Sequence, residues 1–145
     1  MFFDSHVHFD VSSDKDGNEN ISLVERAVKA GVDGLIAVGG SKEGNERAMS
    51  MARRFPDLIF PAVGYDRDQA RELLSSDDEF ESAVFNLKDL IIKNHLTDIK
   101  MVAIGETGLD FHYSPETACL QIKLFESQLK LAKELRLPVI VHSRE

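Results

Sequence analysis

The side chains that could do chemistry gather in three short stretches of the sequence, each beside an apolar run. They are Asp4, His6 and His8 near the start of the chain, then Glu106, then His142. On a β-strand, residues two apart point to the same face and lie about 6.5–7 Å apart. Two imidazoles at this spacing can lean onto one ion, because Zn–N bonds are about 2.0–2.1 Å long. The pattern predicts a divalent-metal site; the alternative is that both histidines are ordinary residues of a half-buried strand.

Five apolar runs of strand length alternate with helical segments along the chain. The predicted strands are 2–9, 32–38, 58–63, 101–105 and 138–141, and the predicted helices are 22–31, 41–55, 68–74, 78–95 and 114–132. Such alternation predicts an α/β fold with parallel strands and right-handed crossovers. The runs are largely apolar, as is typical of parallel strands buried on both faces. Because the carboxyl ends of such strands converge on one face, the histidines and Glu106 are expected to meet there.

Capping residues indicate where several helices begin and end. Ser22 and Glu25 have the spacing of a capping box, and Gly31 is a natural residue to follow the end of that helix. Ser41 is expected to cap the second helix, and Ser114 followed by a proline is expected to begin the last one. Apolar residues of that last helix repeat every three to four positions, at 118, 122, 125, 129 and 132. The polar stretch 10–20 is expected to be a solvated loop.

Composition indicates a single domain with a hydrophobic core. The chain has 145 residues, of which 43% are hydrophobic and 29% are charged, which argues against disorder. The net charge of −8 provides no overall basic field for a polyanion. Any nucleic-acid contact would therefore need a local patch or bound cations.

Cysteine content and the character of the N-terminus point to a cellular compartment. Cys119 is the only cysteine, which excludes an internal disulfide and a multi-cysteine zinc site and favours a reducing environment. This cysteine lies in a predicted helix, where it is expected to pack. The sequence has neither a signal-peptide pattern nor an apolar run long enough to span a membrane. We therefore expect a cytoplasmic protein that does not insert into membranes.

Three motifs together carry a family resemblance. They are Asp4-Ser5-His6-Val7-His8, Gly105-Glu106-Thr107-Gly108-Leu109-Asp110 and Leu137-Pro138-Val139-Ile140-Val141-His142-Ser143-Arg144, with Gln121, Phe125, Gln128 and Leu129 in the helix between the last two. With these motifs, residues 2–144 resemble the TatD family of metal-dependent hydrolases and deoxyribonucleases. The resemblance implies a TIM-barrel fold and hydrolysis of phosphodiester bonds in DNA. It also implies a site with two divalent ions, which could be Zn, Mg or Mn.

Roles carried over from the family remain what the resemblance implies. His6 and His8 resemble ligands of the first metal, Glu106 the catalytic carboxylate that bridges both metals, and His142 a ligand of the second. Asp4 and Asp110 match recurrent acids, which we expect to orient the ligands.

Substrate binding is assigned to three further residues. Arg144 matches the arginine that follows the histidine, and a phosphate-facing role is expected for it. After the third strand the family usually has a His-Pro-His type sequence, whereas Asp66 lies there in this chain. We expect Asp66 to contribute to substrate binding and His112 to substitute in part for the missing histidines; the alternative for His112 is an exposed loop residue with no role.

The length of the chain is a second departure from the family. An eight-stranded barrel typically needs about 250 residues, so residues 1–145 are expected to form one partial TIM barrel of five strands. The family's histidine after the sixth strand and its aspartate after the eighth have no counterpart, and the resemblance implies that this aspartate is the general base. The chain is therefore expected to be the N-terminal part of a hydrolase, weakly active or inactive by itself.

Two alternatives to this nuclease reading remain open. The first is a non-catalytic metal-binding domain that self-associates, since a partial barrel exposes strand edges that seek partners. The second is an amidohydrolase acting on C–N bonds, because such enzymes also use a His-x-His motif on a first barrel strand.

Overall fold

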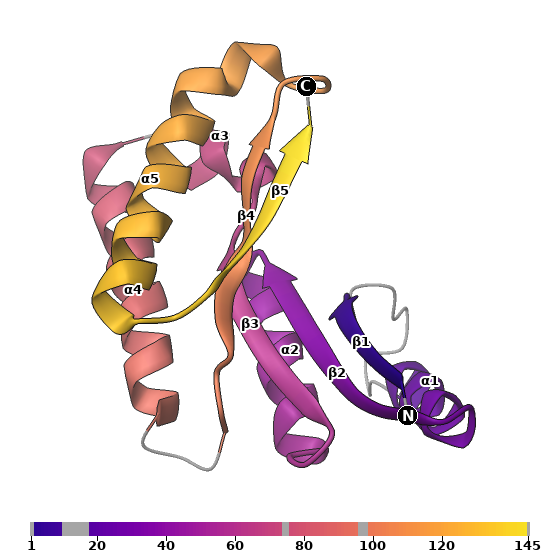
Figure 1. Ribbon diagram of the computed structural model, residues 1–145. Helices are drawn as coiled ribbons and strands as arrows, with labels where there is room; N and C mark the ends of the chain where they lie inside the picture. Colours follow the sequence, from indigo (N-terminus) through magenta and orange to yellow (C-terminus); the bar gives the residue numbers. More distant parts are fainter. Residues whose placement is uncertain (1, 10–17, 74–75, 96–98, 145) are drawn as a thin grey trace.

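The computed structural model describes residues 2–9, 18–73, 76–95 and 99–144, so most of the predicted loop 10–20 lies outside the described residues. Its strands are β1 Phe2–Val7, β2 Val32–Gly40, β3 Ile59–Tyr65, β4 Ala103–Asp110 and β5 Val139–Arg144. They pair in parallel in the order β1-β2-β3-β4-β5 and curl into a half-barrel (Figure 1). The predicted incomplete TIM-type α/β fold is confirmed.

The helices follow the strands in alternation and pack on the outside of the curled sheet (Figure 1). They are α1 Asn18–Lys29, α2 Lys42–Arg54, the 3₁₀ helix η1 Arg67–Gln69, α3 Ala70–Leu73, α4 Asp77–His95, the 3₁₀ helix η2 Pro115–Thr117 and α5 Ala118–Leu135. Helix α2 packs on β2 and β3, and α5 packs on β4. None of the described helices is long and apolar enough to cross a lipid bilayer.

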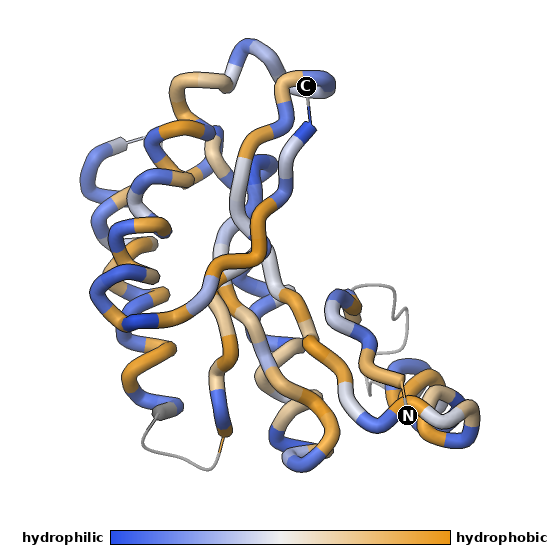
Figure 2. The backbone as a smooth tube through the Cα atoms, viewed as in Figure 1, coloured by the Kyte–Doolittle hydropathy of each residue, from blue (hydrophilic) through white to orange (hydrophobic). Residues whose placement is uncertain are grey.

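The hydrophobic core lies between the central strands and these helices. Figure 2 shows hydrophobic residues along the strands and hydrophobic alternating with hydrophilic residues along the helices. Buried core residues include Ala37, Val63 and Ile104 from the strands and Met49 and Leu124 from the helices. The core therefore holds the three central strands at fixed positions.

The two edge strands are more exposed than we predicted. Phe2 and Phe3 of β1 have exposed fractions of 68% and 56%, and Val141 of β5 has 54%. Among the described residues, β1 pairs only with β2 and β5 only with β4. Burial on both faces is therefore confirmed for β2 to β4 and wrong for β1 and β5, the two strands at the edges of the sheet.

Strands β4 and β5 extend beyond their predicted ends. Parallel pairing of the two strands continues through Gly108 and His142 to Asp110 and Arg144. Glu106 and His142 therefore lie within strands, not after them. The pairing of β4 with β5, which occurs before and after each residue along its strand, holds its backbone more firmly than a loop would.

Two of the predicted helix starts are confirmed and one is wrong. Ser41 caps α2, because its Oγ accepts a hydrogen bond from the N–H of Gly44 at 3.0 Å. The proline after Ser114 occupies the first turn of η2, although the Ser114 side chain caps nothing. Helix α1 begins at Asn18, so Ser22 and Glu25 lie inside the helix and form no capping box at its start.

The buried side of α5 differs from the apolar repeat. Ile122 and Leu129 are exposed, and Cys119, which we expected to pack, is also exposed. Gln121 and Gln128 are buried instead. Their side-chain amides bond to the ends of the strands, and these hydrogen bonds offset the cost of burying the two polar groups.

Candidate metal centre

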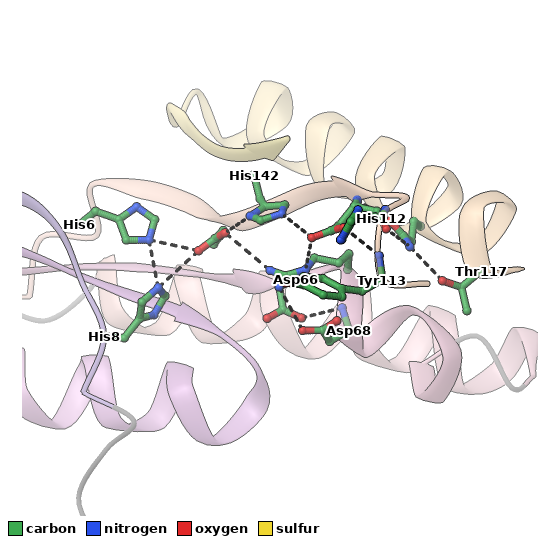
Figure 3. A network of polar contacts seen from close by, with 12 residues as sticks. His6, His8, Asp66, Asp68, His112, Tyr113, Thr117 and His142 are labelled. Carbon is green, nitrogen blue, oxygen red and sulfur yellow. Dashed lines mark hydrogen bonds and ion pairs between the residues drawn. The ribbon is translucent and has the colours of Figure 1, made fainter. Parts of the chain in front are cut away.

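Side chains from the end of β1, the residue that follows it and the middle of β4 lie together (Figure 3). Nε2 of His6 lies 3.0 Å from Nε2 of His8 and 3.1 Å from Oε2 of Glu106. Nε2 of His8 lies 3.4 Å from the same carboxylate oxygen. His6 and Glu106 are 100 residues apart in the sequence, so the fold alone brings these atoms together.

The arrangement fits a divalent ion. Each of His6, His8 and Glu106 offers a ligand atom, and these atoms all lie within 4.8 Å of one another. Ligand atoms on one tetrahedral zinc ion are separated by about 3.3 Å, given bonds of about 2.0–2.1 Å. Nδ1 of His8 lies 3.0 Å from the carbonyl oxygen of Val38, which can only accept a hydrogen bond. Nδ1 therefore carries a proton, which leaves Nε2 as the ring nitrogen that faces Glu106 and could bind a cation.

Glu106 is held in its ionised form. Its pKa is lowered to about 2, chiefly by the hydrogen bond from His8 and, to a smaller extent, by the charges of His6, His8 and His142, while burial opposes the shift. A carboxylate that is charged at neutral pH is the form that binds metal ions.

His142 approaches the opposite oxygen of Glu106. Its Nδ1 lies 2.9 Å from Oε1 of Glu106, and its Nε2 lies 3.1 Å from Oδ2 of Asp110. The four predicted ligands thus divide into a set of three on the Oε2 side and His142 on the Oε1 side. Glu106 lies between them, as a carboxylate shared by two ions would.

Asp110 contacts the ring of His142. Its Oδ1 accepts hydrogen bonds from the N–H groups of His112 at 3.1 Å and Tyr113 at 3.3 Å, which leaves Oδ2 for the imidazole. Burial works to raise the pKa of Asp110, but the hydrogen bonds from His142, Tyr113 and His112 lower it overall. This geometry agrees with the predicted orienting role, which stays a prediction.

Asp4 contacts a ligand residue in a different way. Its Oδ1 accepts a hydrogen bond from the backbone N–H of His6 at 3.1 Å. In the structure, Asp4 therefore shapes the backbone at His6 and is exposed to solvent. Orientation of an imidazole ring by Asp4 stays a prediction.

The three residues assigned to substrate contact residues that are not among the predicted ligands. Oδ1 of Asp66 accepts a hydrogen bond from the N–H of Asp68 at 2.9 Å and caps η1. Burial and the charge of Asp68 raise the pKa of Asp66. The rings of His112 and Tyr113 pack edge-on, with their centroids 4.8 Å apart. The guanidinium of Arg144 lies over the ring of Tyr113, 4.6 Å from its centroid. Their substrate contacts stay predictions.

Sequence reasoning missed Arg67. This first residue of η1 extends its guanidinium between two site carboxylates, with Nη1 3.9 Å from Oε1 of Glu106 and Nε 3.7 Å from Oδ2 of Asp110. The only signal in the sequence is a cation three residues after Gly64, at the end of a strand. That signal does not say which way the side chain points.

Sequence reasoning also missed the roles of three buried amide side chains that tie the strand ends to the helices. Asn45 bonds to the backbone N–H and C=O of Gly64 at 3.0 and 2.9 Å. Gln121 bonds to the same two groups of Asp110 at 2.8 and 3.0 Å. Gln128 does so for Tyr65 at 2.8 and 2.7 Å. These bonds fix the backbone next to the site.

Replacing Gln128 by leucine is expected to lower the free energy of unfolding by about 2–4 kcal/mol, because buried groups of Tyr65 and Thr107 lose their partners. Urea denaturation followed by circular dichroism measures the change. The control is Lys130→Leu on the exposed side of the same helix, where a change within about 0.5 kcal/mol is expected. Equal effects of the two substitutions would contradict a structural role for this amide.

The fold and the site define a (β/α)-barrel-type protein with a histidine and carboxylate centre at the carboxyl ends of its strands. Residues 3–145 match the family model described as TatD related DNase, so the chain belongs to this family. The resemblance seen in the three sequence motifs is confirmed.

Individual relatives agree with this assignment. The uncharacterized metal-dependent hydrolase YabD of Bacillus subtilis is 33% identical over 100% of this chain and 51% of its own length. The 3'-5' ssDNA/RNA exonuclease TatD of Rahnella sp. (strain Y9602) is 32% identical over 96% of this chain and 49% of its own length. The crystal structure of YjjV, a TatD homologue from Escherichia coli, matches with a TM-score of 0.76 and 34% identity, covering 99% of this chain and 51% of that one. The chain spans about half the length of these relatives.

Proposed function

We propose that this chain supplies the metal-binding half of a hydrolase that cleaves phosphodiester bonds in DNA. His6, His8 and Glu106 would hold one divalent ion, and Glu106 and His142 would hold a second. The convergence of three ligand atoms, from β1, the segment directly after it and β4, within 4.8 Å carries the proposal. A relative named as a 3'-5' exonuclease of single-stranded DNA and RNA supports nucleic acid as the substrate class. The cytoplasmic location expected from the sequence is part of this proposal.

The residues of the chain prepare the site in three ways. His8 turns Nε2 toward the site, because Nδ1–H is directed at the carbonyl oxygen of Val38. Glu106 stays ionised and presents one oxygen to each side of the site. Asp110 accepts a hydrogen bond from Nε2–H of His142, so Nδ1, which lies 2.9 Å from Oε1 of Glu106, is the ring nitrogen that would bind a cation. Divalent ions in such a site lower the pKa of water and offset negative charge on a phosphate.

The chain by itself is expected to cleave DNA weakly. The aspartate that the family resemblance implies as general base has no counterpart among its motifs, and general-base catalysis contributes about 10²–10⁴-fold to a rate. The test measures the ions bound per chain by calorimetry with Mn²⁺ and the degradation of end-labelled single-stranded DNA. Binding of close to two ions with slow, Mn²⁺-dependent cleavage is the expected result. Rapid cleavage by rigorously purified protein would contradict the expected weakness, and absence of Mn²⁺ binding would contradict the proposed function.

Self-association is a second candidate function, and the exposed edge strands favour it. Phe3 of β1 and Val141 of β5 are large apolar side chains more than half exposed, at 56% and 54%. Such edges pair readily with another chain, and a second copy offers the same two edges.

We expect the chain to form dimers at high concentration, and Val141→Lys to keep it monomeric, because a charge on an edge strand opposes pairing. Light scattering after size-exclusion chromatography measures the molar mass across a dilution series. The control is Ile122→Lys, which places the same charge at an exposed position of α5. A wild-type protein that is monomeric at every concentration would remove this candidate.

A further inference from the structure

Arg67 is a cation that pairs with two carboxylates of the proposed metal centre. Among the ion pairs of the described residues, it is the only arginine or lysine that pairs with Glu106 or Asp110. Its side chain has an exposed fraction of 21%, so the guanidinium is largely enclosed but can still be reached from solvent. Arg67 therefore lies where a ligand entering the site would meet it.

The donors of this guanidinium are not used up by the protein. Its distances to Asp68, Glu106 and Asp110 are 3.4, 3.9 and 3.7 Å, which are ion-pair separations. In the described parts of the chain, none of its N–H groups makes a well-aligned hydrogen bond. Arginine presents five such donors in a planar fork. The nearby carboxylates hold the guanidinium of Arg67 in place, and its N–H groups remain available to a ligand.

Arg144, the arginine that the family motif points to, is placed differently. Its guanidinium lies over the ring of Tyr113 at 4.6 Å. Arg67 instead faces the oxygen of Glu106 that also receives His142. An anion bound to the proposed metal ions near Oε1 of Glu106 would therefore contact Arg67.

We propose that Arg67 is a substrate-binding residue that holds the non-bridging oxygens of a phosphate group in a nucleic-acid strand. The planar fork of arginine matches phosphate bidentately, and such charged hydrogen bonds are among the strongest that proteins form. The inference rests on the proposed function, because it places the phosphate beside the proposed metal ions. It assigns to Arg67 the phosphate contact that the sequence motif assigned to Arg144.

The test titrates two phosphate compounds into the Mn²⁺-loaded chain by calorimetry. They are thymidine 5′-monophosphate, a monoester, and the dinucleotide TpT, a diester, with thymidine as the compound that lacks phosphate. Arg67→Ala is expected to weaken the binding of both phosphate compounds about tenfold or more. Arg67→Lys should lose less, because it keeps the charge and loses only the fork.

The matched control is Arg71→Ala. Arg71 is an exposed arginine of α3 that pairs with Glu116, so phosphate binding should stay at the wild-type value. Unchanged phosphate binding in both Arg67 variants would overturn the inference. The inference would also be overturned if the Arg67→Ala variant bound one Mn²⁺ ion more than the wild-type chain. The guanidinium would then occupy a position that a metal ion takes, and it would not contact substrate.

Failure of the inference can be told apart from failure of the proposed function. Mn²⁺ binding by the wild-type chain tests the metal site and does not depend on Arg67. If no Mn²⁺ binds, the same phosphate titrations in EDTA still compare wild type with the variants. A loss on Arg67→Ala that is absent from Arg71→Ala would support the phosphate contact even then.

Discussion

Replacing Glu106 by alanine should reduce Mn²⁺ affinity by more than about 100-fold. Removal of a residue that only supports a metal ligand costs at most about 100-fold, and removal of a ligand should cost more. The reason is geometric: one carboxylate contacts His6 and His8 through Oε2 and His142 through Oε1. Its removal takes a ligand from both sides of the proposed site. Isothermal titration calorimetry with Mn²⁺, repeated with Zn²⁺, measures the loss.

Asp110→Ala is the matched comparison, because it also removes a buried carboxylate that contacts His142. It contacts only one of the predicted ligand side chains, so a loss of about 10–100-fold is expected. Equal losses in the two variants would contradict the distinction between Glu106 as ligand and Asp110 as orienting residue. Thermal melting of both variants in EDTA shows whether either loss arises from unfolding.

Replacing Gly108 by alanine should be the most destabilising small change in the chain, by about 3 kcal/mol or more. Gly108 has φ +150°, and a Cβ there would overlap the backbone carbonyl oxygen of His142. Backbone atoms cannot move aside as a flexible side chain can, so β5 would have to shift away from β4. Because His142 lies on β5, the same substitution should also weaken Mn²⁺ binding.

Gly31→Ala separates the two causes of this loss. Gly31 also has a positive φ, +92°, but the nearest atom to a Cβ there belongs to the Phe2 side chain at an ordinary 3.8 Å. Its cost should be that of the backbone conformation alone, about 1–2 kcal/mol. Urea denaturation of both variants measures the difference. A Gly108 variant no less stable than the Gly31 variant would show that the close approach of β4 and β5 carries no energetic cost.

The sequence alone determined the fold class and the meeting of the main site residues. Alternating apolar runs and helical repeats predict parallel strands, and the carboxyl ends of parallel strands converge on one face. His6, His8, Glu106 and His142 come near strand ends, so their proximity followed from a rule that needs no distances. The cap at Ser41 was equally local and was confirmed.

Only the tertiary structure decided which side chains are buried and which way they point. Gln121 and Gln128 face the strands while Ile122 and Leu129 face solvent, because the two amides bond to strand backbone that no local pattern reveals. The exposure of β1 and β5 depends on their place at the edges of the sheet. The direction of Arg67 depends on carboxylates that lie 39 and 43 residues further along the chain. Periodicity reports the local conformation, whereas burial and contact depend on which distant segments pack together.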